Sequence, residues 1–273
     1  MLSNLAGFNP ATDCVAVEDL VKLDRWIISR TAELQAEIIE AYNSYQFHLI
    51  YQKLHNFCVV DLGGFYLDII KDRQYTAKAD ALPRRSAQTA LYYVIEAMVR
   101  WIAPILSFTA EEIWQVMPGE RSNTVFVAEW FDLPKVSDEV FDGRYWDLVA
   151  DVKTAVNKVL EEKRAEGVLG ASLSAEVTLY CDEQLQNELS KLQDELRFVL
   201  ITSAASLKPL TDGSAAEATE VAGLKVTAIK SAAVKCARCW HFRSDVGANP
   251  AHSDICLRCV DNAYGAGEQR HFA

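Results

Sequence analysis

The chain has 273 residues, half of them apolar, and a formal net charge of −11 at pH 7. A chain of this length can bury a sizeable core and form two or three domains. No run of about eighteen apolar residues occurs, which excludes a membrane-spanning helix, and the negative net charge excludes a protein coated uniformly in positive charge for nucleic acid.

Positive charge is concentrated in two short regions of this acidic chain. Residues 136–224 carry 8 Lys+Arg against 17 Asp+Glu, whereas residues 71–85 carry 5 against 2 and residues 225–273 carry 7 against 4. A polyanion can therefore bind at these two basic regions and is repelled elsewhere.

Helices are predicted after a lead-in segment over residues 1–19. Apolar residues recur at close to the helical period over 20–42, over 47–65 and over 86–102, and Gly63-Gly64 is expected to interrupt the second helix. Thr109 to Glu112 has the form of a capping box and predicts a further short helix from there. Because short connections between helices are typical of antiparallel bundles, residues 20–135 are predicted to form one.

The next segment, residues 136–232, is predicted to be a small α+β module. Its first helix is expected over 145–166. Apolar and polar residues then alternate over 176–180 and 224–229, which predicts two strands, and a helix is expected between them over 183–200. Residues 211–220 are rich in Ala, Ser, Gly and Thr, and are predicted to be a mobile loop.

The last segment, residues 233–273, is predicted to be a zinc module. Cys236 and Cys239 form one C-x-x-C pair and Cys256 and Cys259 form a second, and sixteen residues separate the two pairs. This spacing is typical of a four-cysteine zinc site. Four thiolates complete tetrahedral coordination and leave no position open for a substrate, so the pattern predicts one structural Zn²⁺.

Two alternatives to this ligand set stay open in the sequence. The four cysteines could form two disulfides, or His241 or His252 could replace one of them as a ligand. The remaining cysteines are scattered, as expected for reduced thiols, and the N-terminus has no secretory signal. We therefore expect a cytoplasmic location.

Aromatic and basic side chains in the two basic regions are candidates for RNA contacts. Aromatic rings stack on unpaired bases, while guanidinium and ammonium groups meet phosphates. The alternatives are a merely solvated basic surface and, for Trp240, packing over the small core of the zinc module. The candidate residues are Lys71, Arg73, Tyr75, Arg84, Arg85, Arg238, Trp240, Arg243 and Arg258.

No catalytic constellation is found. The five histidines include no pair spaced like a catalytic metal site, and neither a phosphate-binding glycine loop nor a G-x-S-x-G motif occurs. The residues on their own therefore predict a binding unit.

Several stretches of the chain resemble bacterial isoleucyl-tRNA synthetase. Those similar to its anticodon-binding helical domain are Leu23–Trp26, Phe65–Asp80, Arg84–Leu91 and Trp101–Glu112. Those similar to its C-terminal zinc module are Lys235–His241, Cys256–Cys259 and Gly267–Ala273. The resemblance covers essentially the whole chain, and the four-cysteine ending makes it specific for the isoleucine enzyme.

The resemblance implies a mainly α fold, with an antiparallel anticodon-binding bundle, then a small α+β junction module and a four-cysteine zinc module. It also implies recognition of the anticodon loop of isoleucine tRNA by the C-terminal region of a class I synthetase. The family's HIGH-like and KMSKS-like signatures and its editing domain do not occur here. ATP and Mg²⁺ would act only in that missing catalytic core, and no catalytic activity is expected of these 273 residues alone.

The expected partners are isoleucine tRNA and the rest of the synthetase chain, with no membrane, and the expected state is a monomer. The competing hypothesis is a zinc-containing protein-interaction module on a helical scaffold, which the net charge favours. A DNA-binding zinc module is a third possibility, since some DNA glycosylases have similar four-cysteine ends, but the catalytic residues of such an enzyme are not evident here.

Overall fold

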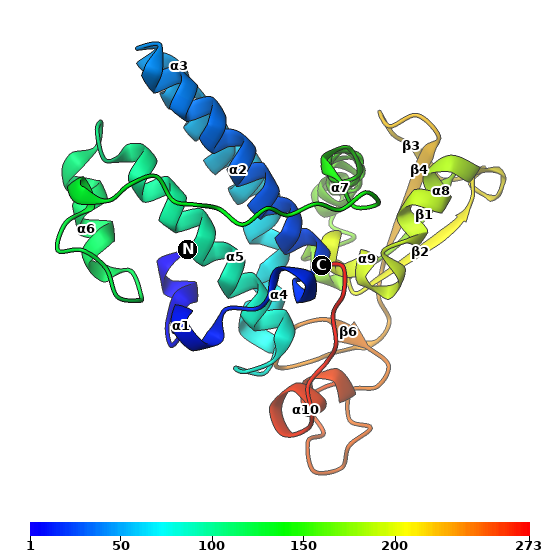
Figure 1. The fold of residues 1–273 in the computed structure, drawn as a ribbon. Coiled ribbons are helices and arrows are strands. Elements are labelled where there is room, and N and C mark those ends of the chain that lie inside the picture. The colour runs from blue at the N-terminus through cyan, green and yellow to red at the C-terminus, as the bar shows by residue number, and fades with distance from the viewer. The chain divides into compact units, whose positions relative to one another are not determined.

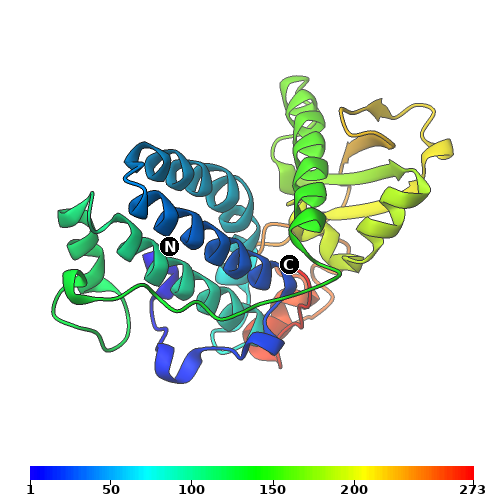
Figure 2. The ribbon, with the colours of Figure 1, turned by 45° about the horizontal axis from the view of Figure 1, so that its top comes forward.

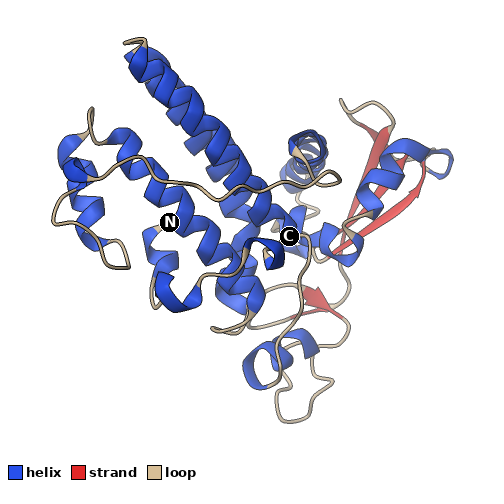
Figure 3. Cartoon of the chain, in the orientation of Figure 1, coloured by secondary structure: helices blue, strands red, loops and turns tan.

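The computed structural model describes residues 1–273 and is mainly helical, as predicted, with two small β-structures (Figures 1 and 3). The chain divides into two compact units, residues 1–74 with 79–142 and residues 75–78 with 143–273. The sequence predicts four segments, and this division into two units does not test the boundaries between them. None of the helices combines the length and the apolar composition needed to cross a lipid bilayer.

The first unit is built from helices. They are α1 (Pro10–Asp13), α2 (Lys22–Asn43), α3 (Phe47–Asn56), α4 (Leu67–Thr76, whose last two residues belong to the second unit), α5 (Leu82–Ile102) and α6 (Ser107–Val116). Helices α2, α3 and α5 lie side by side, with α3 returning antiparallel to α2 (Figure 2). Apolar residues at helical spacing, such as Ile27 and Leu34 on α2 and Leu91 and Val94 on α5, are completely buried. The periodicity of the sequence thus identified the faces that form the core.

A buried charged cluster ties these helices together. The guanidinium of Arg73 on α4 donates two hydrogen bonds to the Asp24 carboxylate on α2, at 2.7 and 2.9 Å. Tyr66 Oη and Ser86 Oγ donate to the same carboxylate at 2.8 and 2.5 Å. All four residues are inaccessible to solvent. Burial, together with the negative charge of Asp24, raises the pKa of Tyr66 well above its usual value.

The expected interruption at Gly63-Gly64 is wrong. The chain between α3 and α4 stays helical as a π-helix, Phe57–Tyr66, and does not break. A Cβ at Gly63 would lie 3.0 Å from the carbonyl oxygen of Cys58, and one at Gly64 would lie 3.3 Å from that of Val59. The two glycines therefore allow the wider helical turns to close, rather than ending the helix.

The predicted capping box is also wrong. Helix α6 begins two residues before Thr109, at Ser107, and its N-cap residue Leu106 forms no side-chain cap. Ser107 Oγ instead donates to the carbonyl oxygen of Ala103 at 2.9 Å. Only a short turn therefore separates the end of α5 from the start of α6.

The lead-in segment, residues 1–19, packs on α5 as part of the first unit. Val15 N donates to Thr89 Oγ1 at 3.0 Å, and Gln88 Nε2 donates to the carbonyl oxygen of Asn4 at 2.9 Å. These contacts satisfy backbone groups of an irregular segment against a regular helix.

The second unit contains a mixed sheet and a two-stranded ribbon. Its helices are α7 (Gly143–Ala165), α8 (Glu183–Ser190), α9 (Leu196–Val199) and α10 (Leu257–Tyr264). Its strands are β1 (Ala175–Cys181), β2 (Ala204–Pro209), β3 (Glu217–Ala218), β4 (Leu224–Lys230), β5 (Val234–Lys235) and β6 (Phe242–Arg243). The sheet order is β2-β1-β4-β3, with β1 parallel to β2 and antiparallel to β4, while β5 and β6 form the ribbon.

The α+β pattern is confirmed in its main elements. The two predicted strands correspond to β1 and β4, whose register pairs Val177 with Ala228 and Leu179 with Val226 on the buried face. The predicted helix over 183–200 divides into α8 and α9, because Gln193 adopts a left-handed backbone with φ of 49°. Strands β2 and β3 lie at the two edges of the sheet, and their short, mixed sequences gave no alternating signal.

We predict that Arg73→Ala lowers the free energy of unfolding by roughly 3–5 kcal/mol, because it leaves the buried Asp24 carboxylate without its cation. The matched control is Lys71→Ala on the same helix, whose pair with Asp68 is exposed and is expected to contribute about 0–1 kcal/mol. Urea denaturation followed by circular dichroism measures both. Equal, small losses in the two variants would contradict a central role for the Asp24 cluster.

Candidate functional site

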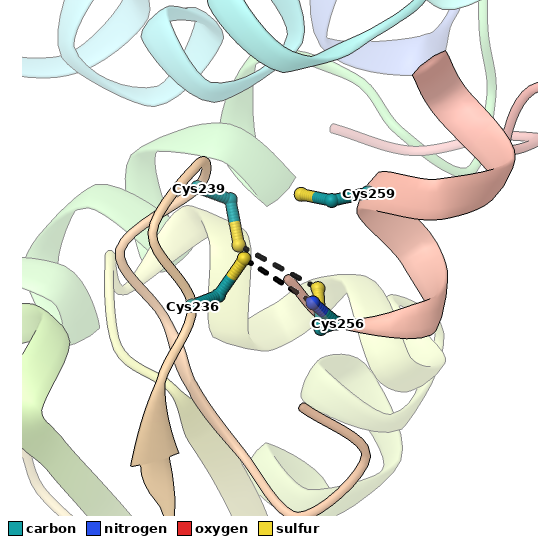
Figure 4. A group of neighbouring side chains, drawn as sticks. All are labelled: Cys236, Cys239, Cys256 and Cys259. Atoms are coloured by element: carbon teal, nitrogen blue, oxygen red, sulfur yellow. Dashed lines mark hydrogen bonds between the residues drawn. The ribbon is translucent and has the colours of Figure 1, made fainter. Parts of the chain in front are cut away.

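The four cysteines of the two C-x-x-C pairs converge in the second unit (Figure 4). Cys236 and Cys239 lie in the turn between β5 and β6, Cys256 precedes the first residue of α10, and Cys259 lies in its first turn. All four are buried, and their sulfur atoms lie within 4.8 Å of one another. The ribbon and the helix thus place one pair each on a common centre.

The arrangement fits a tetrahedral metal ion. Four sulfurs at about 2.3 Å from one ion are about 3.8 Å apart, and the sulfurs of Cys239 and Cys256 are separated by 3.8 Å. Every cysteine of the chain is a free thiol, so the disulfide alternative is wrong in this structure. The histidine alternative is not supported either, because the ring of His241 packs on Phe198 and that of His252 stacks on Tyr264 at 4.0 Å.

Hydrogen bonds within the cluster favour a thiolate. Cys256 N donates to Cys236 Sγ at 3.4 Å, and Arg238 Nη1 lies 3.8 Å from Cys259 Sγ. Hydrogen bonds from Cys239 and Cys259 lower the pKa of the Cys256 thiol, while the same interaction raises the pKa of Cys239. A divalent ion that binds here therefore displaces protons from the thiols that remain protonated.

Little apolar surface supports the cluster. The buried core around the sulfurs consists of Ile255, with Val246 and Val260 partly buried against it. So small a core contributes little folding free energy by itself, and small metal modules take theirs from the ion.

Trp240 is displayed on the surface of the cysteine turn. Its side chain is 60% exposed, which contradicts the interpretation that it covers the core of the module. Its backbone is left-handed, with φ of 66°, a conformation that is rare for a bulky residue. Trp240 N donates to the carbonyl oxygen of Cys236 at 3.0 Å, so the turn that joins the two cysteines holds the residue in this position.

Lys235 is a candidate that the sequence analysis missed. Its ammonium group lies 5.3 Å from the centre of the Trp240 ring, within the range of a cation–π interaction. The sequence feature that could have identified Lys235 is its position directly before Cys236. The strand that carries it, β5, is too short to be recognised from alternation. The structure thus joins an exposed indole and a cation in one place.

Two of the candidate arginines are used inside the second unit. Arg238 Nη1 donates to the carbonyl oxygen of Thr76 at 2.6 Å, and Arg258 Nη2 donates to Thr76 Oγ1 at 2.6 Å. Tyr75, next to Thr76, is 72% exposed. The structure therefore brings Thr76, inside the first basic region, to the cysteine turn. Arg243, close to that turn in the sequence, pairs with Asp245 at 3.6 Å.

The candidates in the first unit differ in their accessibility. Lys71 is exposed, whereas Arg73 is fully buried in the Asp24 cluster and has no surface to offer to an RNA. Arg84 is half-buried, and desolvation lowers the pKa of its guanidinium. Arg85 pairs with Asp13 of the lead-in at 3.2 Å, so part of its charge is already used within the protein.

Two family models match the chain. Residues 24–179, more than half of the chain, match the model described as "Anticodon-binding domain of tRNA ligase". Residues 235–262 match the model described as "Zinc finger found in FPG and IleRS". The second match includes all four cysteines of the cluster, which is therefore the four-cysteine cluster of a zinc finger.

Curated relatives match the chain over its whole length. It is 59% identical to the isoleucine--tRNA ligase of Saccharophagus degradans, 58% identical to that of Teredinibacter turnerae and 58% identical to that of Pseudomonas putida strain GB-1. In each case the chain spans 29% of the length of the relative.

Proposed function

The chain belongs to the family of anticodon-binding domains of tRNA ligases, and we propose that it recognises the anticodon loop of isoleucine tRNA. It corresponds to the C-terminal part of isoleucine--tRNA ligases. Attachment of isoleucine to tRNA, with ATP and Mg²⁺, is proposed for a longer protein that includes such a chain. These 273 residues would contribute recognition and no catalytic group.

The observation that carries this proposal is the exposed Trp240 on the cysteine turn. An aromatic ring held on a rigid turn beside a cation can stack on an unpaired base while the cation meets the adjoining phosphate. Tyr75 supplies a second exposed ring, on the segment that Arg238 binds through Thr76. Lys71, Arg84, Arg85 and Arg243 are proposed to contact phosphates.

We propose that the four cysteines hold one Zn²⁺ ion with a structural role. The four buried thiols form a complete ligand set, so no position is open for a reacting molecule. The ion would supply the folding free energy of the module and keep the Trp240 turn rigid. Arg238, within reach of Cys259 Sγ, would offset part of the negative charge of the thiolates.

One observation favours a protein partner as a second function. A cavity of about 830 Å³ in the first unit is lined by Tyr42, Tyr45, Phe47, Tyr51 and Ile105, together with Asn43, His48 and Pro104, and no Lys or Arg lines it. Tyr45 and Tyr51 are mostly exposed. This lining is better suited to contact an apolar patch of a partner protein than to contact phosphate groups. If tRNA binds elsewhere on the chain, the chain can bind both a protein and a tRNA.

We predict one zinc ion per chain, and a chelator should unfold residues 233–273 while the first unit keeps its helices. Cys256→Ser is expected to lose the metal. Cys181→Ser is the control, because it removes a buried thiol outside the cluster. Elemental analysis and hydrogen exchange measure the two effects. A purified protein without stoichiometric metal, or with disulfides among the four cysteines, would contradict the proposal.

For Trp240→Ala we expect a loss of roughly 1–3 kcal/mol in binding of isoleucine tRNA, the range for removal of an aromatic stacking platform. Zinc content should be unchanged, since the side chain is exposed and covers no ligand. Trp130→Ala, an exposed tryptophan of the first unit, is the control and should bind normally. Filter binding at fixed salt gives the affinities, and equal affinity for both variants would exclude stacking on Trp240.

The double substitution of Arg84 and Arg85 by alanine should weaken tRNA binding and its dependence on salt. Each lost phosphate contact reduces the slope of log K against log salt by about 0.7–0.9. Asp13→Ala is the control, because it removes the partner of Arg85 but keeps the positive charge. An unchanged slope in the double variant would place both arginines outside the RNA interface.

A further inference from the structure

The C-terminal tail of the second unit, residues 268–273, ends in three residues whose backbone amides all donate to one carboxylate. Glu195, in the turn before α9, accepts hydrogen bonds from three consecutive backbone amides: His271 N at 2.7 Å, Phe272 N at 2.9 Å and Ala273 N at 2.7 Å. Glu195 is only 8% exposed. Charge-assisted hydrogen bonds of this kind are stronger than neutral ones, so the tail is fixed where an irregular segment would otherwise be free to move.

The fixed tail places Arg270 on the ring of Phe198 in α9. The guanidinium carbon lies 3.1 Å from the ring centre, and Arg270 Nη1 donates to the carbonyl oxygen of Ala273 at 3.1 Å. Arg258 lies over the same ring at 4.9 Å, and the ring of His241 contacts it edge-on at 5.6 Å. Phe198 is therefore the point where the tail, α10 and the cysteine turn meet.

A second carboxylate connects the tail to the cysteine cluster. Glu268 Oε2 accepts a hydrogen bond from Arg270 Nε at 3.1 Å, and it forms an ion pair with Arg258, whose Nε lies 3.0 Å away. Arg258 precedes the ligand residue Cys259, and it also donates to Thr76 Oγ1. A continuous series of polar contacts thus runs from the tail to Arg258, next to Cys259, and through Thr76 to Arg238, next to Cys239.

We propose that Glu195 is a positioning residue for RNA binding. It holds the tail so that Arg270 and Arg258 stay on Phe198, and Phe198 supports His241, the residue next to Trp240. The orientation of the Trp240 ring for a base is then set by a carboxylate outside the zinc finger. This inference rests on the proposed binding of tRNA.

The physical effect is preorganisation. A finger that is already held in its binding orientation loses less conformational freedom when the RNA binds. A bound ion would fix the cysteine turn internally, but it would not fix the turn relative to α9, because none of the four cysteines lies on that helix. Release of the tail therefore lowers affinity while the metal stays bound, which a role in local folding alone would not produce.

The experiment compares Glu195→Gln with Asp194→Asn in the full 273-residue chain. The first change keeps the shape of the side chain but turns one acceptor oxygen into an amide that cannot accept an amide hydrogen. The second removes the same charge from the adjacent, exposed residue. Each variant is assayed for zinc content, for hydrogen exchange of the tail amides and for affinity for isoleucine tRNA.

Glu195→Gln should speed exchange at residues 271–273, keep one zinc ion and raise the Kd for tRNA by about tenfold, whereas Asp194→Asn should behave as the unmodified chain. Retained exchange protection, or an unchanged Kd with a mobile tail, overturns the inference. Failure of the unmodified chain to bind tRNA instead overturns the proposed function, and the exchange data then still report whether Glu195 holds the tail.

A second variant guards against misfolding of Glu195→Gln. Deletion of residues 271–273 removes the three donors and leaves Glu195 in place. If Glu195 acts through the tail, combining the deletion with Glu195→Gln raises Kd no further than either change alone. Additive losses would show that the two act independently and would overturn the inference.

Discussion

The buried pair of Asp24 and Arg73 is the constraint on which the first unit depends. A carboxylate in the first turn of α2 and a guanidinium near the end of α4 are both completely removed from solvent, and each is acceptable there only because of the other. Tyr66 and Ser86 complete the hydrogen bonding of the carboxylate, so the pair specifies how the π-helical segment and α5 meet α2. The residues that directly follow Arg73 and Gln74, Tyr75 to Lys78, belong to the other unit. Most of helix α4 thus belongs to the first unit, and its last two residues begin a short segment of the second.

The same kind of pairing occupies several arginines of this acidic chain within the protein. Arg73, Arg85, Arg238, Arg258 and Arg270 are each bound to a carboxylate or a carbonyl oxygen of the protein. Arginine is suited to this use because its planar group donates several hydrogen bonds at once. Recognition of an RNA would then rely on exposed aromatic rings and on exposed cations such as Lys71 and Lys235. Such an interface would select unpaired bases, with only a moderate contribution from phosphate charge.

In the second unit, the four-cysteine cluster and the residues that support it have different roles. The cysteine cluster can fix the turn that carries Trp240, but its own apolar core is too small to orient that turn against a neighbour. Phe198, Glu195 and Glu268 supply the orientation through contacts that lie outside the two C-x-x-C pairs. Parts of the chain separated by almost two hundred residues in sequence, Thr76 and Arg258, therefore meet at this support.

The sequence alone determined the elements whose signal is local. Helical periodicity located α2, α5 and α7, alternation located β1 and β4, and the spacing of four cysteines located the four-cysteine cluster, because each pattern reflects the geometry of one element or one turn. Tertiary structure decided which charged and aromatic residues are accessible. Arg73 and Tyr75 are two positions apart in one basic segment, yet the first is buried against Asp24 and the second is exposed. Trp240 could equally have covered the core or faced solvent. Local sequence does not record these differences, since burial depends on partners such as Asp24, Thr76 and Phe198 that only the folded chain brings into contact.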